Sequence, residues 1–343
     1  MNKVANKNIQ NYKIILRLFS SKISLCKRHR MKGELFMKKY KIIIAFLMVI
    51  SILSACNSKG NEEFSYKNVK NNKIDHIHGS GFINEGSEFV IATHLGLYKY
   101  GKEGWKEANS QKHDYMGFQT VKDGFISSGH PEEGSEYKNP LGIIKSKDNG
   151  TTFERLAFYG EIDFHYLAAG YDSNTIYVLN ETQTAGLNKG LNYSINNGAT
   201  WKKVAMNGFT SDTISNLAAH PINKDLIAIG SKDGVFISNN YGEDFTLLYN
   251  TKMVTYVTLS EKGGYYSNFE NDTAHLKSFF YEKNNEKEVQ LPEKGKINPI
   301  ASIAVNPKNH KEIAIVTFNN DIYLTKDNGG NWVKLSSNGK LIK

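Results

Sequence analysis

The chain has 343 residues, and its formal net charge of +9 at pH 7 is concentrated at the N-terminus. Residues 1–36 carry a net +8 and residues 37–55 another +3, so the remaining 288 residues carry −2. A nearly neutral domain lacks the basic surface that nucleic acid requires, and we therefore exclude a nucleic-acid partner. The only cysteines are Cys26 and Cys56, so no disulfide can form within these 288 residues, which are numerous enough to build a core without one.

Residues 37–55 have the layout of a secretory signal peptide. Three lysines follow Met37, residues 42–53 are apolar, and the segment ends in small residues. The apolar run of twelve residues is too short to span a bilayer, which takes roughly 20 residues. Residues 1–36 show no clear periodicity, and we interpret them as an extended N-terminus or as the product of a start assigned upstream of Met31 or Met37.

The tetrapeptide Leu53-Ser54-Ala55-Cys56 resembles the lipobox of bacterial lipoproteins. This resemblance implies lipidation of the Cys56 thiol, cleavage just before Cys56 and acylation of the new N-terminus. It predicts an exported protein that this lipid anchors to the outer face of the bacterial cell membrane. An ordinary signal peptide that happens to contain a cysteine is the alternative. Because residues 57–63 are polar, we assign residues 56–73 to the lipidated cysteine and a flexible tether, and residues 74–340 to the folded domain.

Four octapeptides with one pattern of residue types recur through the folded domain. They start 48, 44 and 87 residues apart, and the last interval is two periods. Their shared positions, in chain order, are Ser146, Asp148, Gly150 and Phe153; Ser194, Asn196, Gly198 and Trp201; Ser238, Asn240, Gly242 and Phe245; and Thr325, Asp327, Gly329 and Trp332. The pattern resembles the Asp-box, S-x-D-x-G-x-T-W, of the BNR-repeat proteins, a group that includes sialidases and sortilin-type propellers.

The residue types of the octapeptide favour a tight turn between two strands. Asp or Asn next to Gly tolerates the left-handed backbone of such turns, and its side chain can bond the turn backbone. The closing aromatic starts the next strand and can pack between sheets. We therefore interpret these positions as structural and expect no catalysis from their carboxylates.

Two weaker repeats complete a series of six. Residues 98–105 carry an aromatic at the same offset, 48 residues before the first octapeptide, and a polar turn follows Tyr281. Short runs rich in β-branched and aromatic residues precede each turn, and no helical apolar period follows the signal. Units of roughly 40 to 50 residues predict an all-β fold, a six-bladed β-propeller with four-stranded antiparallel blades. Seven blades are the alternative, if residues 60–74 and the C-terminal tail combine.

Six histidines fall in the first three repeats and are the candidate metal or ligand residues: His76, His78, His94, His113, His130 and His165. Several begin or precede an expected innermost strand, so their imidazoles can converge at the mouth of the central channel, with Asp75, Asp114 or Asp163 beside them. We place His130 in a loop that interrupts the second repeat. Imidazole suits Zn, Cu and Ni, so the candidate cofactor is a transition metal. The alternative is that these histidines are structural.

Residues 74–337 as a whole resemble the bacterial BNR-repeat lipoproteins usually labelled glycosyl-hydrolase-like. The segments that carry the resemblance are HIHGSGF, IATHLGLY, HDYMGF, SGHPEEGS and LGIIKSKDNG, together with the later octapeptides. The resemblance implies the propeller fold, and a fold alone does not set the function. Sialidases hold the substrate carboxylate with three arginines, whereas the folded domain has only Arg155, so we exclude a sialidase of that kind.

Three functions remain open. The first is a surface-anchored binding or scaffold module for a protein, glycan or cell-wall ligand. The second is a histidine-lined metal-binding propeller, which acts in metal handling or as a metal-dependent enzyme. The third is a glycoside hydrolase, which needs two carboxyl groups about 5 to 9.5 Å apart. The candidate carboxylates are Glu132, Glu133, Asp114 and Asp163.

Overall fold

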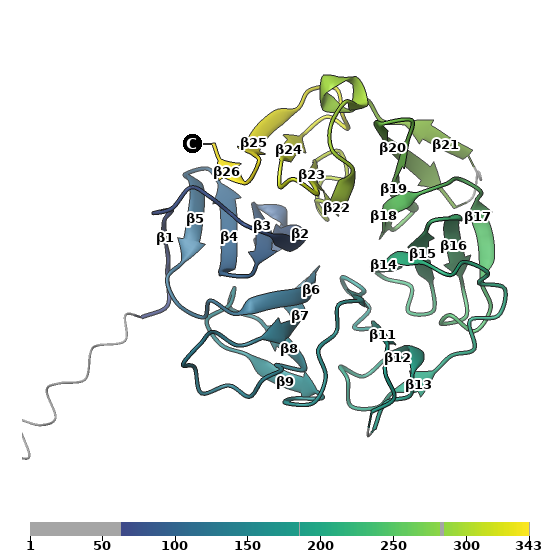
Figure 1. Cartoon of the computed structure of the whole chain (residues 1–343), viewed down its shortest axis with the longest axis horizontal. Helices are drawn as coiled ribbons and strands as arrows, with labels where there is room; N and C mark the ends of the chain where they lie inside the picture. The colour runs from purple at the N-terminus through teal and green to yellow at the C-terminus, as the bar shows by residue number, and fades with distance from the viewer. Residues whose placement is uncertain (1–62, 185, 282–284, 343) are drawn as a thin grey trace, which may run out of the picture. The chain divides into compact units, whose positions relative to one another are not determined.

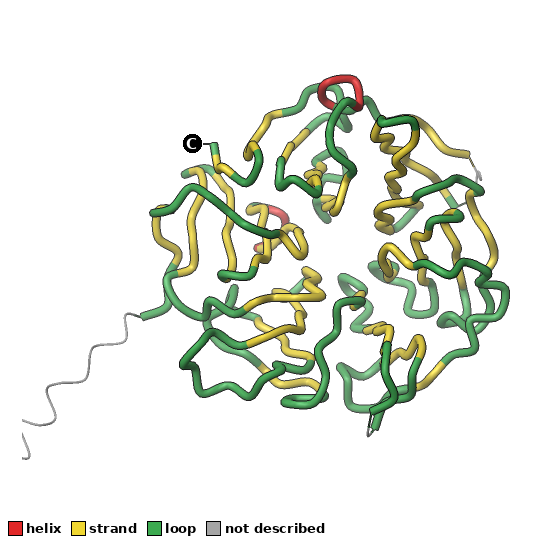
Figure 2. The backbone as a smooth tube through the Cα atoms, viewed as in Figure 1, coloured by secondary structure: helices red, strands yellow, loops and turns green. Residues whose placement is uncertain are grey.

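Residues 63–184, 186–281 and 285–342 are described by the computed structural model, and they form six β-sheets arranged as a ring (Figure 1). The predicted signal peptide and Cys56 lie outside the described residues. Strands and turns make up nearly all of the ring, and its helices are the short 3-10 turns η1 (Asn84–Gly86) and η2 (Pro292–Gly295) (Figure 2). Within these residue ranges no helix has the length and apolar character needed to cross a membrane.

The first three sheets are the blades that carry the histidine-rich segments, and neighbouring strands are antiparallel in each. Blade 1 has the order β1-β5-β4-β3-β2 from rim to centre: β1 (Tyr66–Asn68), β2 (Ile77–Ile83), β3 (Glu88–Thr93), β4 (Gly96–Gly101) and β5 (Gly104–Ala108). Blade 2 consists of β6 (Asp114–Val121), β7 (Gly124–His130), β8 (Ile143–Ser146) and β9 (Glu154–Ala157). Blade 3 consists of β10 (Leu167–Ala169), β11 (Ile176–Asn180), β12 (Gly190–Ser194) and β13 (Lys202–Lys203).

The other three sheets repeat the same antiparallel order. Blade 4 consists of β14 (Ile214–Ala219), β15 (Ile227–Ser231), β16 (Gly234–Ser238) and β17 (Thr246–Tyr249). Blade 5 consists of β18 (Val254–Ser260), β19 (Gly263–Glu270), β20 (Thr273–Phe280) and β21 (Asn285–Glu288). Blade 6 consists of β22 (Ile300–Val305), β23 (Ile313–Thr317), β24 (Ile322–Thr325), β25 (Val333–Ser337) and β26 (Lys340–Leu341). The prediction of an all-β propeller with six antiparallel blades is confirmed.

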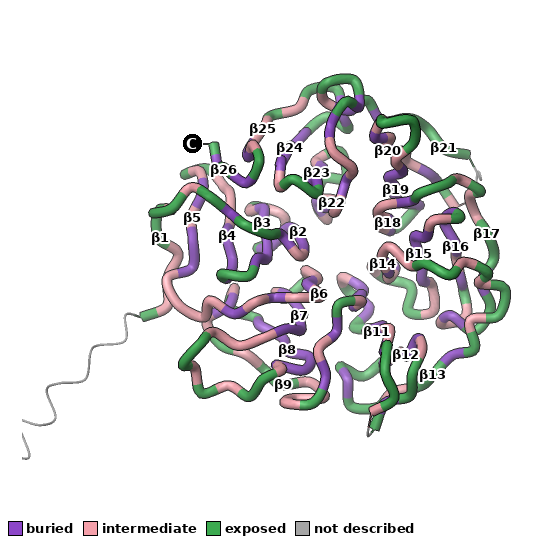
Figure 3. Tube along the Cα trace, in the orientation of Figure 1, coloured by how far each residue is buried: buried purple, intermediate pink, exposed green. Residues whose placement is uncertain are grey.

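The ring has no single hydrophobic core, because each pair of neighbouring blades encloses its own apolar cluster. Side chains alternate between the two faces of a strand, so a middle strand supplies two clusters at once. Val90 and Ile91 are adjacent in β3, and both are fully buried. Val90 packs with residues of blade 2, whereas Ile91 packs with residues of blade 6. The middle strands of the blades are accordingly buried along most of their length (Figure 3).

The two ends of the described chain meet at the junction of blades 1 and 6. The backbone of Ile74 donates to Gly339 at 2.8 Å, and that of Leu341 donates to Asn72 at 2.7 Å. β1 pairs with β5 and β26 with β25, so both terminal segments extend existing blades and no seventh sheet forms from the described residues. Residues 64–73 thus belong to the propeller, which corrects the predicted start of the folded domain at residue 74.

The four octapeptides form one and the same hydrogen-bonded turn. In the first, the Ser146 hydroxyl donates to Asp148 Oδ1 at 2.9 Å and accepts the amide of Gly150 at 2.8 Å. Asp148 Oδ1 also accepts the amide of Thr152 at 2.9 Å. The octapeptides that start at Ser194, Ser238 and Thr325 repeat all three bonds. These side chains are occupied within their own turns, which supports the structural interpretation.

Candidate functional site

Five of the six candidate histidines, all except His113, gather where the innermost strands begin, an end of the ring that we call the mouth. β2 starts at Ile77, between His76 and His78, and β6 starts at Asp114. Because β3 runs antiparallel to β2, its last residue, Thr93, pairs with Ile77, and His94 follows directly. Residues that are 16 positions apart in sequence are thereby brought together by one strand reversal.

A cavity of about 230 Å³ opens at the mouth. Its lining includes a residue from each innermost strand, namely His78, Gly117, Leu167, Ser215, Thr255 and Ala301. His76, His165 and Phe318 also line it. The mouth is therefore a place where side chains from several blades meet a space that a small ligand can enter.

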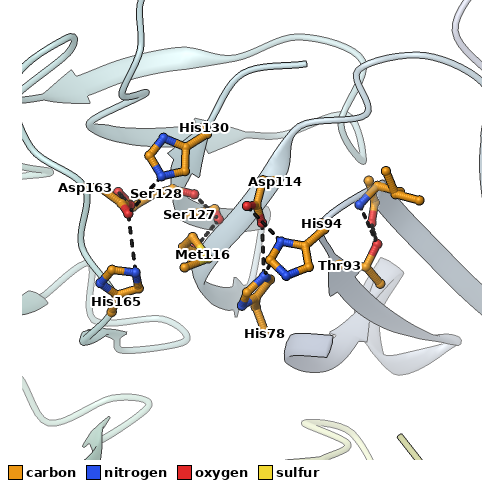
Figure 4. A network of polar contacts seen from close by, with 12 residues as sticks. His78, Thr93, His94, Asp114, Met116, Ser127, Ser128, His130, Asp163 and His165 are labelled. Carbon is orange, nitrogen blue, oxygen red and sulfur yellow. Dashed lines mark hydrogen bonds and ion pairs between the residues drawn. The ribbon is translucent and has the colours of Figure 1, made fainter. Parts of the chain in front are cut away.

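His78, His94 and Asp114, which we call the Asp114 trio, form the tightest cluster at the mouth (Figure 4). His78 Nε2 lies 3.2 Å from His94 Nδ1 and 3.0 Å from Asp114 Oδ1. His94 Nδ1 lies 2.9 Å from Asp114 Oδ2. Among the described residues, this is the one group of three or more His, Cys, Asp or Glu whose donor atoms all lie within 4.8 Å of one another.

No placement of protons makes all the contacts within the Asp114 trio favourable. If both facing nitrogens carry a proton, their N–H groups oppose each other across 3.2 Å; if only one does, a lone pair of the other meets the carboxylate. Asp114 Oδ1 is buried and makes no hydrogen bond with any described residue, although His78 Nε2 is 3.0 Å away. A cation placed between the three donor atoms would satisfy all of them.

The contacts within the trio keep Asp114 ionised, which is the form of a carboxyl group that binds metal. Burial acts to raise the pKa of Asp114, but the contacts with His78 and His94 outweigh it and hold that pKa below its ordinary value of 3.8. Burial lowers the pKa of His76, and the neighbouring His78 and His94 lower it further. The ring of His76 lies 4.7 Å from that of His78 and 5.3 Å from that of His94. At neutral pH the cluster thus holds a carboxylate next to a neutral His76.

His130, His165 and Asp163, which we call the Asp163 trio, form a second cluster beside the first (Figure 4). Asp163 Oδ2 lies 3.4 Å from His130 Nε2 and 3.5 Å from His165 Nε2. His130 is the last residue of β7 and pairs with Asp114 across the sheet, so the prediction that it lies in a loop is wrong. The inserted loop begins one residue later.

His113 does not belong to the site, in contrast to its prediction as a ligand candidate. It is fully buried, its Nδ1 accepts the amide of Glu132 at 2.8 Å, and burial lowers its pKa to about 4. Glu132 in turn accepts the amide of Lys112 at 2.9 Å, and Glu133 is exposed. The bonds of Glu132 with His113 and Lys112 fasten the inserted loop. No contact recorded for the described residues joins Glu132 or Glu133 to a trio. Asp75 is held through its backbone oxygen, which accepts a hydrogen bond from the side-chain amide of Asn320.

Sequence patterns did not reveal the residues that orient the Asp163 trio. Asn139 Oδ1 lies 2.7 Å from His130 Nδ1, and the Ser128 hydroxyl donates to Asp163 Oδ1 at 3.3 Å. Asn139 lies in the inserted loop and Ser128 inside β7, where nothing in the local pattern distinguishes them from other polar residues. Arg155, the single arginine of the folded domain, lies on β9 at the rim, away from the innermost strands.

Comparison with known proteins identifies the fold and no closer relationship. No family known by sequence matches the chain, and no curated protein matches it. A GH74 enzyme from Niastella koreensis has a similar structure, with a TM-score of 0.50, 16% identity, and coverage of 79% of this chain and 46% of that one. A GH74 xyloglucanase from Xanthomonas campestris has a TM-score of 0.49 and 16% identity, with 80% and 47% coverage. An oligogalacturonate lyase from Vibrio parahaemolyticus has a TM-score of 0.49 and 10% identity, with 77% and 78% coverage.

The chain spans less than half the length of the two GH74 structures that it resembles. At identities this low, structural similarity shows a shared β-propeller fold only, and it does not transfer an activity from one protein to the other. The resemblance to BNR-repeat lipoproteins therefore stays a prediction.

Proposed function

We propose that this protein is a metal-binding propeller of the bacterial cell surface, with the Asp114 trio as its metal site. The observation that carries the proposal is the convergence of two imidazole nitrogens and one carboxylate to mutual distances of 2.9–3.2 Å. Ligands about 2.1 Å from a common ion lie about 3.0 Å apart at right angles and about 3.4 Å apart at tetrahedral angles. The two ring nitrogens are thus spaced much like two ligands of one ion, and each lies at a similar distance from its own oxygen of the Asp114 carboxylate.

The ligand types narrow the choice of ion and of role. Two imidazoles and a carboxylate suit Zn, Cu or Ni, and magnesium or calcium would require more oxygen ligands. Three protein ligands leave a coordination position of a four-coordinate ion open, which is typical of sites that exchange the ion or activate a bound molecule, and not of closed structural sites. We therefore favour metal handling or metal-dependent chemistry over a structural metal.

The anchor is the second part of the proposal. The motif that ends at Cys56 supports lipidation, and a lipid there would hold the mouth on the outer side of the cell membrane, where metal ions first reach the cell. A scaffold role for a protein, glycan or cell-wall ligand is compatible with such a site. A glycoside hydrolase has less support, because contacts with histidines already occupy both mouth carboxylates, Asp114 and Asp163.

Elemental analysis tests the metal site. The chain from residue 56 would be made with Cys56→Ser and without a histidine tag. It would be dialysed against Zn, Cu or Ni, and unbound metal would then be removed by dialysis against metal-free buffer. We expect at least one tightly held ion per chain, and loss of this ion in a His78→Ala/Asp114→Asn variant. His275→Ala is the matched control, because His275 pairs with Glu288 at 3.1 Å on an outer strand of blade 5 and does not line the mouth cavity. The proposal is refuted if the parent protein retains no ion, or if the variant and the control retain equal amounts of it.

A further inference from the structure

We propose that the Asp163 trio is a second metal position, which binds the same class of divalent transition-metal ion more weakly than the Asp114 trio does. The inference extends the proposed function, because it assigns two ions to the mouth. The two trios share no residue, and they draw on different strand ends. His130 ends β7, whereas His165 and Asp163 precede β10.

The two contacts of Asp163 Oδ2 fit ligands of one ion better than they fit hydrogen bonds. The two contacts of Asp163 Oδ2, at 3.4 and 3.5 Å, are longer than the 2.7–3.2 Å of an ordinary N–H···O bond. They equal the distance of about 3.4 Å that separates two tetrahedral ligands of one ion. The carboxylate oxygen thus lies near two ring nitrogens without a hydrogen bond to either.

Hydrogen bonds with neighbouring residues orient the trio so that its lone pairs face the space between its donor atoms. His130 Nδ1 donates to Asn139 Oδ1 at 2.7 Å, which leaves the lone pair of a neutral His130 ring on Nε2, the atom that faces Asp163. Ser128 donates to Asp163 Oδ1, and the amide of Phe164 donates to the Ser128 hydroxyl at 2.9 Å. Asp163 Oδ2 is left to face the imidazoles. Metal-binding histidines commonly donate their second N–H to an oxygen in this way, and such partners orient the ligands.

The second site is less preorganised than the first. Among the described residues, only the Asp114 trio has all its donor atoms within 4.8 Å of one another, so His130 and His165 must approach each other when an ion binds. The His165 side chain is 53% exposed and has room to turn, whereas the Asp163 side chain is only 15% exposed and stays in place. The cost of this rearrangement makes the second ion the weaker one.

Calorimetric titration of the metal-stripped chain from residue 56, carrying Cys56→Ser, with Zn²⁺ tests the inference. We expect two binding events, and we expect Asp163→Asn or His165→Ala to abolish the weaker event and leave the tighter one. Asn139→Ala should weaken the second event roughly 10- to 100-fold, as loss of an orienting partner does at other metal sites. Asp172→Asn is the control, because Asp172 pairs with Lys122 at the surface, at 2.8 Å. Because His165 is exposed, His165→Ala should fold and be as stable as the parent protein. It therefore still tests the second site if Asp163→Asn does not fold.

The outcomes separate this inference from the proposed function. A single event that Asp114→Asn removes and both Asp163→Asn and His165→Ala leave intact would overturn the second site and preserve the first. A single event that only the Asp163 and His165 variants remove would support the second site and refute the Asp114 site. No binding at all in the parent chain would overturn both.

Discussion

His113 and His78 show how one residue type serves two purposes at neighbouring positions of the same propeller. His78 reaches the mouth, where two other donor atoms lie within 3.2 Å. His113 comes immediately before Asp114, yet its ring turns into the apolar cluster between blades 1 and 2 and packs on Tyr137 and Phe153. Burial then makes the neutral ring the stable form, and its Nδ1 serves as an acceptor for the loop.

The buried ring of His113 predicts a pH dependence of stability. Its pKa is about 4 in the folded protein and about 6.5 when unfolded, so the unfolded chain binds the proton more readily between these values. The stability contributed by the neutral ring is complete above pH 6.5 and is lost as the pH falls to about 4. At 1.36 kcal/mol per pH unit, the loss amounts to about 3 kcal/mol.

Urea unfolding at several pH values checks this expectation. In His113→Asn the side-chain oxygen can still accept the amide of Glu132, but the side chain does not titrate. We expect the free energy of unfolding of the metal-free variant to fall less on acidification from pH 7 to 4.5 than that of the parent protein. Parallel curves for the two proteins would show that His113 does not cause the acid sensitivity.

At the scale of the strands, local patterns predicted the elements and the pairing of strands positioned the side chains. The octapeptide turns follow from residues only a few positions apart, and they form as expected. The place of His130 depends on β7 extending to the mouth, where it pairs with the start of β6. The run Ser127-Ser128-Gly129-His130 did not distinguish a strand end from a loop.

β26 is two residues long, and its contribution to ring closure can be measured. Leu341 is 4% exposed and packs in the cluster between blades 1 and 6, whereas its neighbour Ile342 is 41% exposed. We expect Leu341→Ala to lower the free energy of unfolding by about 2–4 kcal/mol, because it removes buried methyl groups and leaves a cavity. Ile342→Ala should change it by about 0.5 kcal/mol or less. Equal effects would mean that the C-terminal strand does not close the ring in solution.

At the scale of the whole molecule, the ring brings residues of three blades to one mouth, and the predicted anchor decides on which side of the membrane that mouth lies. Each blade contributes only one or two of the donor atoms, so the candidate site exists only once the blades are packed side by side. The six separate clusters between blades hold this arrangement, which suits a site that needs a rigid frame and an open entrance.

Fractionation of bacterial cells tests the anchor. We expect the full chain to sediment with the membrane and to partition into detergent, because acyl chains contribute about 0.8 kcal/mol per buried CH₂ group. Cys56→Ser should release it from the membrane fraction, and Cys26→Ser, the matched control, should leave it there. A Cys56→Ser protein that still sediments with the membrane would contradict lipidation at this residue.

The sequence by itself determined that the folded domain is all-β and has six blades, because turn chemistry and strand alternation act over a few residues and recur at a regular period. It also named His78, His94 and Asp114, and His130, His165 and Asp163, which the structure brings together as two clusters. Of its other candidates, His113, Glu132 and Glu133 lie outside both clusters. Only the tertiary structure decided that His94 joins His78 and Asp114, that His130 joins Asp163 instead of Glu132 or Glu133, and that His113 is buried. These contacts join different strands and blades, and their register is decided by the packing of whole sheets against one another, which no local pattern records.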